Sequence, residues 1–191
     1  MDKGFEEDIK NCIKVLRSGG VILYPTDTVW GLGCDPSNAE AVEKIFRIKE
    51  RNESKSLIML ANGLDMVERY TRDIPSAALE ILSASDKPVT IIFPSAKNIA
   101  PAMMAEDGSV GIRITDDPFC LQLIERFRKP LVSTSANISG EPAPSHFGEI
   151  SGTILSRVDF VVEYRKEDRR KHKPSPVIKV EQNGVIKIIR M

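Results

Sequence analysis

The stretch Tyr24–Asp35, YPTDTVWGLGCD, constrains this chain more than any other part of its sequence. It follows a short apolar run, Val21–Leu23, that is typical of a buried strand. It precedes Ser37 and Glu40, whose spacing fits a capping box at the start of a helix. In α/β proteins, ligands bind where strand ends meet helix N-termini. The stretch is therefore either a binding site or a tight strand–helix connection whose Thr and Asp side chains satisfy the loop's own backbone, and its chemistry leaves both interpretations open.

We also expect particular structural roles for single residues of this stretch. Pro25 cannot donate to a strand ladder, so strand pairing is expected to stop near it. Gly31 and Gly33 permit backbone angles closed to other residues, or the close approach of a ligand. Asp27 could orient a water molecule or a metal ion, but capping of the turn is the preferred interpretation.

Composition places the chain among ordinary globular proteins. Its 191 residues are 41% hydrophobic and 28% charged, which predicts one domain over residues 1–191. Lys plus Arg and Asp plus Glu both number 27, so binding of nucleic acid by bulk positive charge is not indicated.

The cysteines, Cys12, Cys34 and Cys120, form no C-x-x-C pair, so neither a zinc site nor a disulfide framework is expected. The chain shows no apolar run of ~18 residues and no signal-peptide pattern, which predicts a cytoplasmic protein without a membrane span.

Hydrophobic periodicity predicts helices and strands in alternation, hence an α/β fold with a mixed sheet. Helices are expected at Phe5–Leu16, Asn38–Lys49, Leu64–Tyr70, Pro75–Ala84, Pro118–Phe127 and Phe147–Leu155. Strands are expected at Val21–Tyr24, Leu57–Ala61, Pro88–Phe93, Ser109–Ile114, Leu131–Thr134 and Phe160–Glu163. Asn98–Gly108 is expected to be a loop with a short helix. Asn183-Gly184 between two apolar runs, Val177–Val180 and Val185–Ile189, predicts a hairpin.

A run of charge, Arg165–Lys173, contains no apolar residue. The preferred interpretation is a solvated, mobile loop without an apolar anchor. The alternative is a lid over a neighbouring site, ordered when a triphosphate binds.

Three separated motifs resemble the signature segments of the YrdC/Sua5 family, the threonylcarbamoyl-AMP synthases, in its short form. Tyr24–Asp35 resembles the family's Y-P-T-[DE]-T-x-[YF/W]-G-L-x-x-[DN]. Lys49–Ile58 resembles its K-x-R…[KN]-P-L segment, and Ser133–Gly140, STSANISG, resembles its [ST]-x-S-A-N-x-S-G motif. Three matches in register make a specific signal. The resemblance implies a single domain in which a twisted mixed β-sheet with flanking helices surrounds an open groove.

The resemblance also implies an activity. L-threonine, bicarbonate and ATP would give threonylcarbamoyl-AMP and pyrophosphate, for the biosynthesis of t6A in tRNA by a downstream transferase machinery. ATP is expected to arrive with Mg²⁺, and no dedicated metal site is expected in the chain. Such a reaction mainly requires that anions be held close together and that charge developing on phosphorus be stabilised.

Site residues follow from the motif positions. Lys49 and Arg51 are expected to be catalytic, and Arg51 and Lys55 to contact ATP. Arg113 is expected to anchor the threonine carboxylate or the carbamate. The other contacts that the resemblance implies are Asn137 and Ser145 for ATP, and Thr28, Ser135 and Ser175 for threonine or carbamate.

Each of these assignments has a structural alternative. Cations in the last turn of a helix, such as Lys49, interact favourably with the negative end of the helix dipole. Arg113 could be a surface arginine of a strand. The chain also departs from the family pattern. Leu60 stands where long members carry a His, and further differences fall at Ser56, Ser85–Lys87 and Pro176.

Two other functions compete with the synthase. The first is a double-stranded RNA- or tRNA-binding protein of the same family without synthase activity. Zero net charge and 6% aromatic residues give such a protein few groups to contact phosphates or to stack on bases. The carbamoyl-adenylate domain of hydrogenase maturation proteins normally comes with zinc-finger regions, for which the cysteines do not suffice. No His is placed to form a Ser-His-Asp arrangement, so a hydrolase is not indicated.

Overall fold

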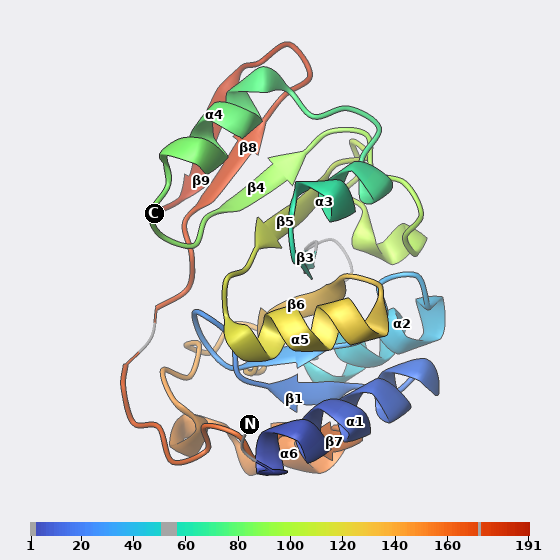
Figure 1. The fold of residues 1–191 in the computed structure, drawn as a ribbon, viewed down its shortest axis with the longest axis vertical. Helices are drawn as coiled ribbons and strands as arrows, with labels where there is room; N and C mark the ends of the chain where they lie inside the picture. Colours follow the sequence, from blue (N-terminus) through green and yellow to red (C-terminus); the bar gives the residue numbers. More distant parts are fainter. Residues whose placement is uncertain (1–2, 51–56, 172) are drawn as a thin grey trace.

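The centre of the molecule is a mixed sheet with the strand order β7-β1-β2-β6-β3-β5-β4-β8-β9 (Figure 1). The structure is a computed structural model, and it describes residues 3–50, 57–171 and 173–191. Neighbouring strands are parallel in the pairs β1/β7, β3/β5 and β4/β8 and antiparallel in the others. The strands are β1 (Ile22–Tyr24), β2 (Gly31–Gly33), β3 (Ile58–Ala61), β4 (Thr90–Phe93), β5 (Val110–Ile114), β6 (Leu131–Ser135), β7 (Phe160–Val161), β8 (Val177–Val180) and β9 (Ile186–Arg190).

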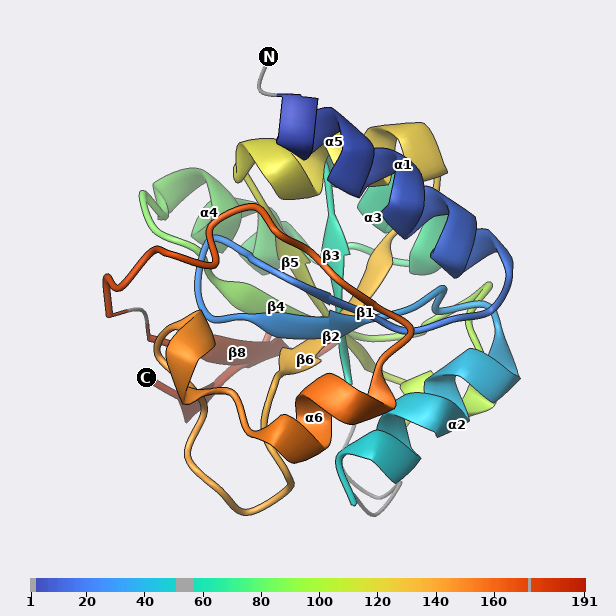
Figure 2. The same ribbon diagram turned by 90° about the horizontal axis from the view of Figure 1, so that it is seen from below.

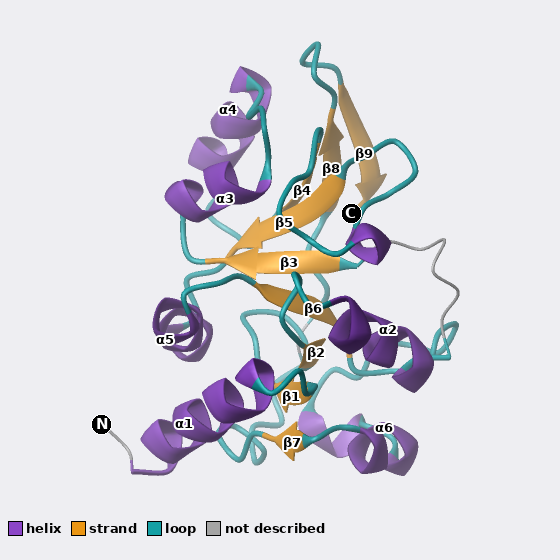
Figure 3. Cartoon of the chain, turned by 90° about the vertical axis from the view of Figure 1, so that its right-hand side faces the viewer, coloured by secondary structure: helices purple, strands orange, loops and turns teal. Residues whose placement is uncertain are grey.

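Helices cover both faces of this sheet (Figures 2 and 3). Helices α1, α3, α4 and α5 lie on one side, and α2 and α6 on the other. Their bounds are α1 (Lys3–Arg17), α2 (Ala39–Ile48), α3 (Leu64–Tyr70), α4 (Ser76–Ala84), α5 (Pro118–Phe127) and α6 (Gly152–Arg157), with 3₁₀ turns η1 (Pro101–Met103) and η2 (Phe147–Glu149). None of the helices within the described ranges has the length and apolar character that a membrane crossing requires. The predicted α/β class with a mixed sheet and flanking helices is confirmed.

The hydrophobic core forms where the helices meet the sheet. The apolar stripe of α1 is buried and packs on α5, with the Phe5 and Phe119 ring centroids 5.3 Å apart. Cys12 and Cys120 are buried in this core, as the helical pattern predicts, and Cys34 is buried too. The hairpin around Asn183-Gly184 is formed by β8 and β9, and Gly184 has the positive φ of 83° that the turn needs.

Two predictions about the Tyr24–Asp35 stretch require correction. Its second half is not a loop, because Gly31–Gly33 forms β2 between β1 and β6. Neither Gly31 nor Gly33 has a positive φ. A Cβ on Gly33 would lie 2.6 Å from Cε1 of Tyr24, so this glycine makes room for the Tyr24 ring. The Tyr24 hydroxyl crosses β2 and donates to the Val132 carbonyl at 3.2 Å. Pairing of β1 does end at Tyr24, directly before Pro25, as predicted.

The predicted capping box at Ser37 is wrong. Asn38 is the N-cap of α2, and its side-chain oxygen accepts from Ala41 N at 3.1 Å. Ser37 is already engaged, because its amide and hydroxyl both donate to Asp35 Oδ1. The predicted helix Phe147–Leu155 is also wrong as one element, because Ser151 starts α6 separately after η2. Two strands are shorter than predicted by two residues: β4 begins at Thr90, and β7 ends at Val161.

The Arg165–Lys173 run is attached at its first residues. The Arg165 guanidinium lies 4.9 Å from the centroid of the Tyr164 ring, and Lys166 Nζ lies 5.1 Å from that of Phe147. The prediction that the run has no apolar anchor is therefore wrong for these two residues. Further along, Arg170 is exposed and pairs with Asp168. His172 lies outside the described residues.

Candidate functional site

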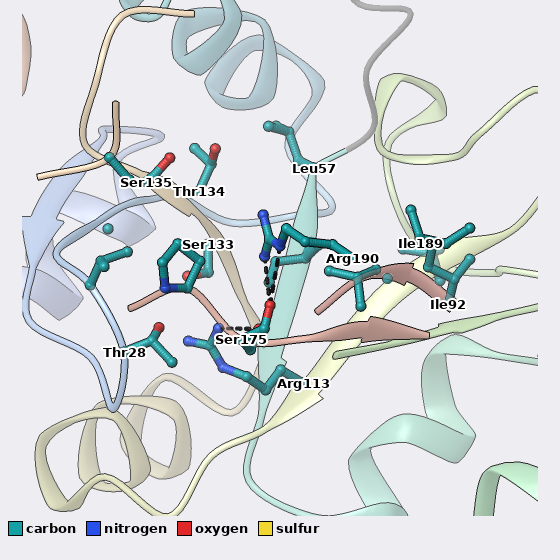
Figure 4. A pocket seen from close by; sticks show the side chains of 18 of the residues that line it. Thr28, Leu57, Ile92, Arg113, Ser133, Thr134, Ser135, Ser175, Ile189 and Arg190 are labelled. Carbon is teal, nitrogen blue, oxygen red and sulfur yellow. Dashed lines mark hydrogen bonds between the residues drawn. The ribbon is translucent and has the colours of Figure 1, made fainter. Parts of the chain in front are cut away.

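A cavity of about 750 Å³ opens on the sheet, lined by residues from distant parts of the sequence. Figure 4 shows side chains from the β1–β2 turn, β5, β6 and the C-terminal hairpin that surround it. The residues predicted from the motifs that line this cavity are Thr28, Arg113, Ser135, Asn137 and Ser175. The sheet brings these five together, although they belong to separate segments of the chain. Which ligand each would contact stays a prediction.

Arg113 is a buried cation that lines the cavity. It lies on β5 and is only 4% exposed, so it is not a surface arginine. Its Nη2 forms an ion pair with Asp27 Oδ1 at 2.8 Å, and its Nη1 donates to Ser175 Oγ at 3.3 Å. Within the described part of the chain, Arg113 Nε and Asp27 Oδ2 are buried without a hydrogen-bond partner. One guanidinium thus links the β1–β2 turn to the segment that precedes β8.

Asp27 does not cap its turn, contrary to the preferred interpretation of the sequence. Thr26 closes the turn instead: its Oγ1 accepts from Thr28 N at 3.0 Å and donates to Val29 O at 2.8 Å. The Asp27 carboxylate is left for Arg113. Burial raises the pKa of Asp27 above its usual value, and Arg113 offsets this only in part because it reaches one carboxylate oxygen. The nearby carboxylates of Asp117 and Asp116 raise the pKa further.

Ser175 is the point on which two arginines converge (Figure 4). Its hydroxyl lies 2.8 Å from Thr90 Oγ1 and 3.3 Å from Arg113 Nη1. Its carbonyl accepts from Arg190 Nη2 at 2.7 Å. Arg190 lines the cavity, and burial together with the neighbouring charge of Arg113 lowers its pKa. The cavity therefore presents two guanidinium groups to a ligand, which suits an anion.

Sequence reasoning missed Arg190, the last residue of β9 and the second-last of the chain. A regular hairpin register would not have found it, because the pairing of Val180 with Ile186 extrapolates to Ile189 opposite Val177. A register shift between Val177 and Ile178 places Arg190 there instead, two residues after Ser175. Lys179 also lines the cavity and pairs with Asp107, whose pKa this contact lowers to about 2.

Lys49 lies behind the cavity wall and not among its lining residues. It is 1% exposed, and its ammonium donates to the backbone carbonyls of Ser135 and, at 2.7 Å, of Asn137. Its own carbonyl accepts from Ser139 N at 2.8 Å. Lys49 thus fixes the loop that carries Ser135 and Asn137, both of which do line the cavity.

The remaining predicted residues are Ser145, Arg51 and Lys55. Ser145 is not among the cavity-lining residues, and its amide and hydroxyl both donate to Glu149 Oε2 at 2.7 Å. These two hydrogen bonds lower the pKa of Glu149. Arg51 and Lys55 lie outside the described residues, as does Ser56.

The described residues contain no group of three His, Cys, Asp or Glu side chains that could hold a metal ion. Glu141 is the one carboxylate among the described residues that line the cavity. The donors around the cavity are otherwise hydroxyl, amide, guanidinium and ammonium groups, which suit an anionic ligand better than a bare cation.

Known proteins are similar to this chain in sequence and in fold. Residues 14–191 match the Sua5/YciO/YrdC family model, described as "Telomere recombination". The threonylcarbamoyl-AMP synthase of Photobacterium profundum is 34% identical over 160 residues, 82% of this chain and 86% of that protein. Two solved structures, each 24% identical, share the fold. YciO of E. coli has a TM-score of 0.83 over 95% of this chain and 87% of its own. Sua5 of P. abyssi in complex with L-threonine has a TM-score of 0.80 over 93% of this chain and 52% of its own. A match over nearly the whole chain, to proteins built on this same sheet, means that the chain belongs to the Sua5/YciO/YrdC family.

Proposed function

We propose that this protein is a threonylcarbamoyl-AMP synthase, which converts L-threonine, bicarbonate and ATP to threonylcarbamoyl-AMP and pyrophosphate. The observation that carries the proposal is the cavity in which Arg113 and Arg190 converge on Ser175, beside the hydroxyls and amide of the β6 loop. The curated relative is named for this activity. That name favours catalysis over the RNA-binding alternative.

The Arg113 end of the cavity suits threonine. A carboxylate or carbamate has the geometry that a guanidinium binds with paired hydrogen bonds. Thr28, Ser135 and Ser175 supply hydroxyls to the same cavity, and that of Ser175 contacts Arg113. The L-threonine bound by Sua5 of P. abyssi is a relevant precedent for a substrate in this fold.

Arg190, Lys179 and Asn137, which also line the cavity, suit the nucleotide. Guanidinium and ammonium groups stabilise phosphate oxygens, and the Asn137 amide can hydrogen-bond to the base or ribose. We assign Arg51, Lys55 and Ser145 to ATP as the motifs predict, with Mg²⁺ arriving on the triphosphate. A bound nucleotide would replace Glu149 as the acceptor of the Ser145 hydroxyl.

The reaction then needs little covalent help from the chain. Threonine and bicarbonate give a carbamate with loss of water. A carbamate oxygen attacks the α-phosphorus of ATP, the bond to the β-phosphate oxygen breaks, and pyrophosphate leaves. Arg113 would hold the carbamate for this attack, and Arg190 would stabilise negative charge on the phosphates. Lys49 acts through Ser135 and Asn137, whose loop it fixes, and is a positioning residue in this account.

The product is a reactive mixed anhydride, so it must pass to a second enzyme that modifies tRNA. The cytoplasm, where tRNA and ATP are available, is the compartment in which this sequence of reactions would operate.

Product identification tests the proposal. The protein is incubated with ATP, Mg²⁺, bicarbonate and isotope-labelled threonine, and the mixture is analysed by mass spectrometry. The expected product is an adenylate that contains both the labelled threonine and one additional carbonyl group. An adenylate that carries threonine without the carbonyl group would contradict the proposal, as would ADP as the sole nucleotide product.

A further inference from the structure

We propose that Arg165 is a positioning residue for the threonine end of the cavity. It fastens the Thr26–Thr28 turn to the segment that follows β5, and it thereby helps to keep Asp27 and Arg113 together. The inference rests on the proposed function only for the identity of the ligand. Its structural content, a bridge between two segments, can be tested without any substrate.

The bridge consists of one guanidinium with contacts to both segments. Arg165 Nη1 lies 2.5 Å from Asp117 Oδ2, and it also lies 3.5 Å from the carbonyl oxygen of Thr26. Asp117 has a side chain that is 4% exposed, and its other oxygen, Oδ1, caps the first turn of α5 through Phe119 N and Cys120 N. The short contact to a buried, hydrogen-bonded carboxylate fixes Arg165 firmly, and the long contact places it against the turn.

The two bridged segments are those that carry the Arg113–Asp27 pair. Asp117 follows Arg113 by four residues, and Thr26 directly precedes Asp27. In the sheet, however, β2, β6 and β3 separate β1 from β5, so no ladder joins the two segments directly. The structure joins them through Arg113, which pairs with Asp27 and also lies 3.4 Å from Thr26 Oγ1, and through the Arg165 bridge. A weak thiol contact from Cys120 Sγ to Pro25 O at 3.4 Å adds to these.

Charge adds to this geometry. Asp117 and Asp27 are close enough for the negative charge of one to affect the other, and Arg165 neutralises Asp117. Without Arg165, the buried Asp117 carboxylate would lose its countercharge beside the Arg113–Asp27 pair. Breaking a buried ion pair by removing one partner is costly because it leaves an uncompensated charge. The turn that carries Asp27 and Thr28 would therefore move or loosen.

The charged run supplies its own control. Arg170 belongs to the same run and also forms an ion pair, with Asp168 Oδ2 at 2.5 Å. Its side chain is 76% exposed, and its backbone and side-chain donors bond to the Asp168 carboxylate. Arg165→Met and Arg170→Met thus remove the same charge from neighbouring positions, but only the first removes the bridge.

The test measures steady-state kinetics and amide hydrogen exchange in both variants. We expect Arg165→Met to raise the KM for threonine about 10-fold, while the KM for ATP changes less than about 2-fold. We also expect faster exchange in the peptide that contains Thr28, whose amide donates to Thr26 Oγ1. Arg170→Met should match the wild type in both measurements. Equal behaviour of the two variants would overturn the inference.

A second variant separates positioning from loss of fold stability. In Arg165→Met/Asp117→Asn, the buried charge is removed with its partner, and the Asn oxygen can still cap α5. The melting temperature should recover while the threonine KM stays raised. Recovery of both would mean that Arg165 only stabilises the fold, and the inference would be wrong. If the wild type makes no threonylcarbamoyl-AMP, the proposed function fails, and hydrogen exchange at Thr26–Thr28 alone decides the inference.

Discussion

Arg113 and Asp27 form a buried ion pair, Nη2 to Oδ1 at 2.8 Å, across a sheet in which three strands separate their segments. Arg113 lines the cavity, and the pair leaves Arg113 Nε and Asp27 Oδ2 without hydrogen-bond partners among the described residues. An arginine held in this way is pre-positioned for an anion, because little side-chain entropy is left to lose on binding.

Replacement of Arg113 should affect threonine most. We expect Arg113→Ala to lower kcat/KM for threonine about 10- to 100-fold, because a charge-assisted contact to a buried anion is lost. Steady-state kinetics with threonine as the varied substrate measure this. Arg126→Ala is the matched control, since Arg126 pairs with Glu6 on the surface between α5 and α1. A similar loss in both variants would show that the effect is not specific to the cavity.

Activity should depend on the protonation of Asp27. Burial raises its pKa, so the folded state binds a proton more readily than the unfolded chain. The free energy of unfolding should therefore fall as the pH rises from the ordinary Asp pKa through the raised pKa of the folded state. Asp27 is ionised, and can pair with Arg113 as a carboxylate, only above that raised pKa. We expect threonine affinity to increase with pH over that window. Asp27→Asn should flatten the profile, and an identical profile in that variant would exclude Asp27 as its origin.

Lys49 should act on both substrates. Its ammonium holds the carbonyls of Ser135 and Asn137, which lie on the wall shared by the two proposed subsites. We expect Lys49→Met to raise the KM for ATP and for threonine, each by about 10-fold, and to lower the melting temperature. Arg47→Ala, which alters an exposed residue of the same helix, serves as the control. An effect confined to kcat would instead favour direct contact of Lys49 with the reacting groups.

Arg190 should matter for the nucleotide. We expect Arg190→Ala to raise the KM for ATP about 10-fold, because Arg190 supplies one of the two guanidinium groups in the cavity. Lys187→Ala is the control, because Lys187 lies on the same strand and pairs with Glu181. Calorimetric titration with a non-hydrolysable ATP analogue measures the same difference directly. Equal affinities in the two variants would remove Arg190 from the nucleotide site.

The sequence predicted local features well. The apolar stripe of α1, the helix α5 over Pro118–Phe127 and the C-terminal hairpin all depend on neighbouring residues, and each was found as expected. The motif residues that line the cavity, such as Thr28 and Ser135, could also be named, because they lie in segments that resemble the signature motifs of the family.

Features that depend on the order of strands could not be predicted. The pairing of Asp27 with Arg113 requires two segments that are distant in the sequence to lie side by side. The hydrophobic periodicity of the sequence does not indicate which segments do so. The inward direction of Lys49 follows from the position of the Ser135–Ser139 loop over the end of α2. Arg190 was missed because its role depends on the return of β9 beside Ser175.

The dependence of pyrophosphate release on substrates tests the central claim most directly. ATP, Mg²⁺, threonine and bicarbonate are supplied together and with each omitted in turn, and AMP-containing product, pyrophosphate, ADP and phosphate are quantified. The account predicts pyrophosphate in equal amount to the adenylate, and none when threonine or bicarbonate is left out. Release of ADP and phosphate without threonine would contradict it and would make the protein a simple ATPase.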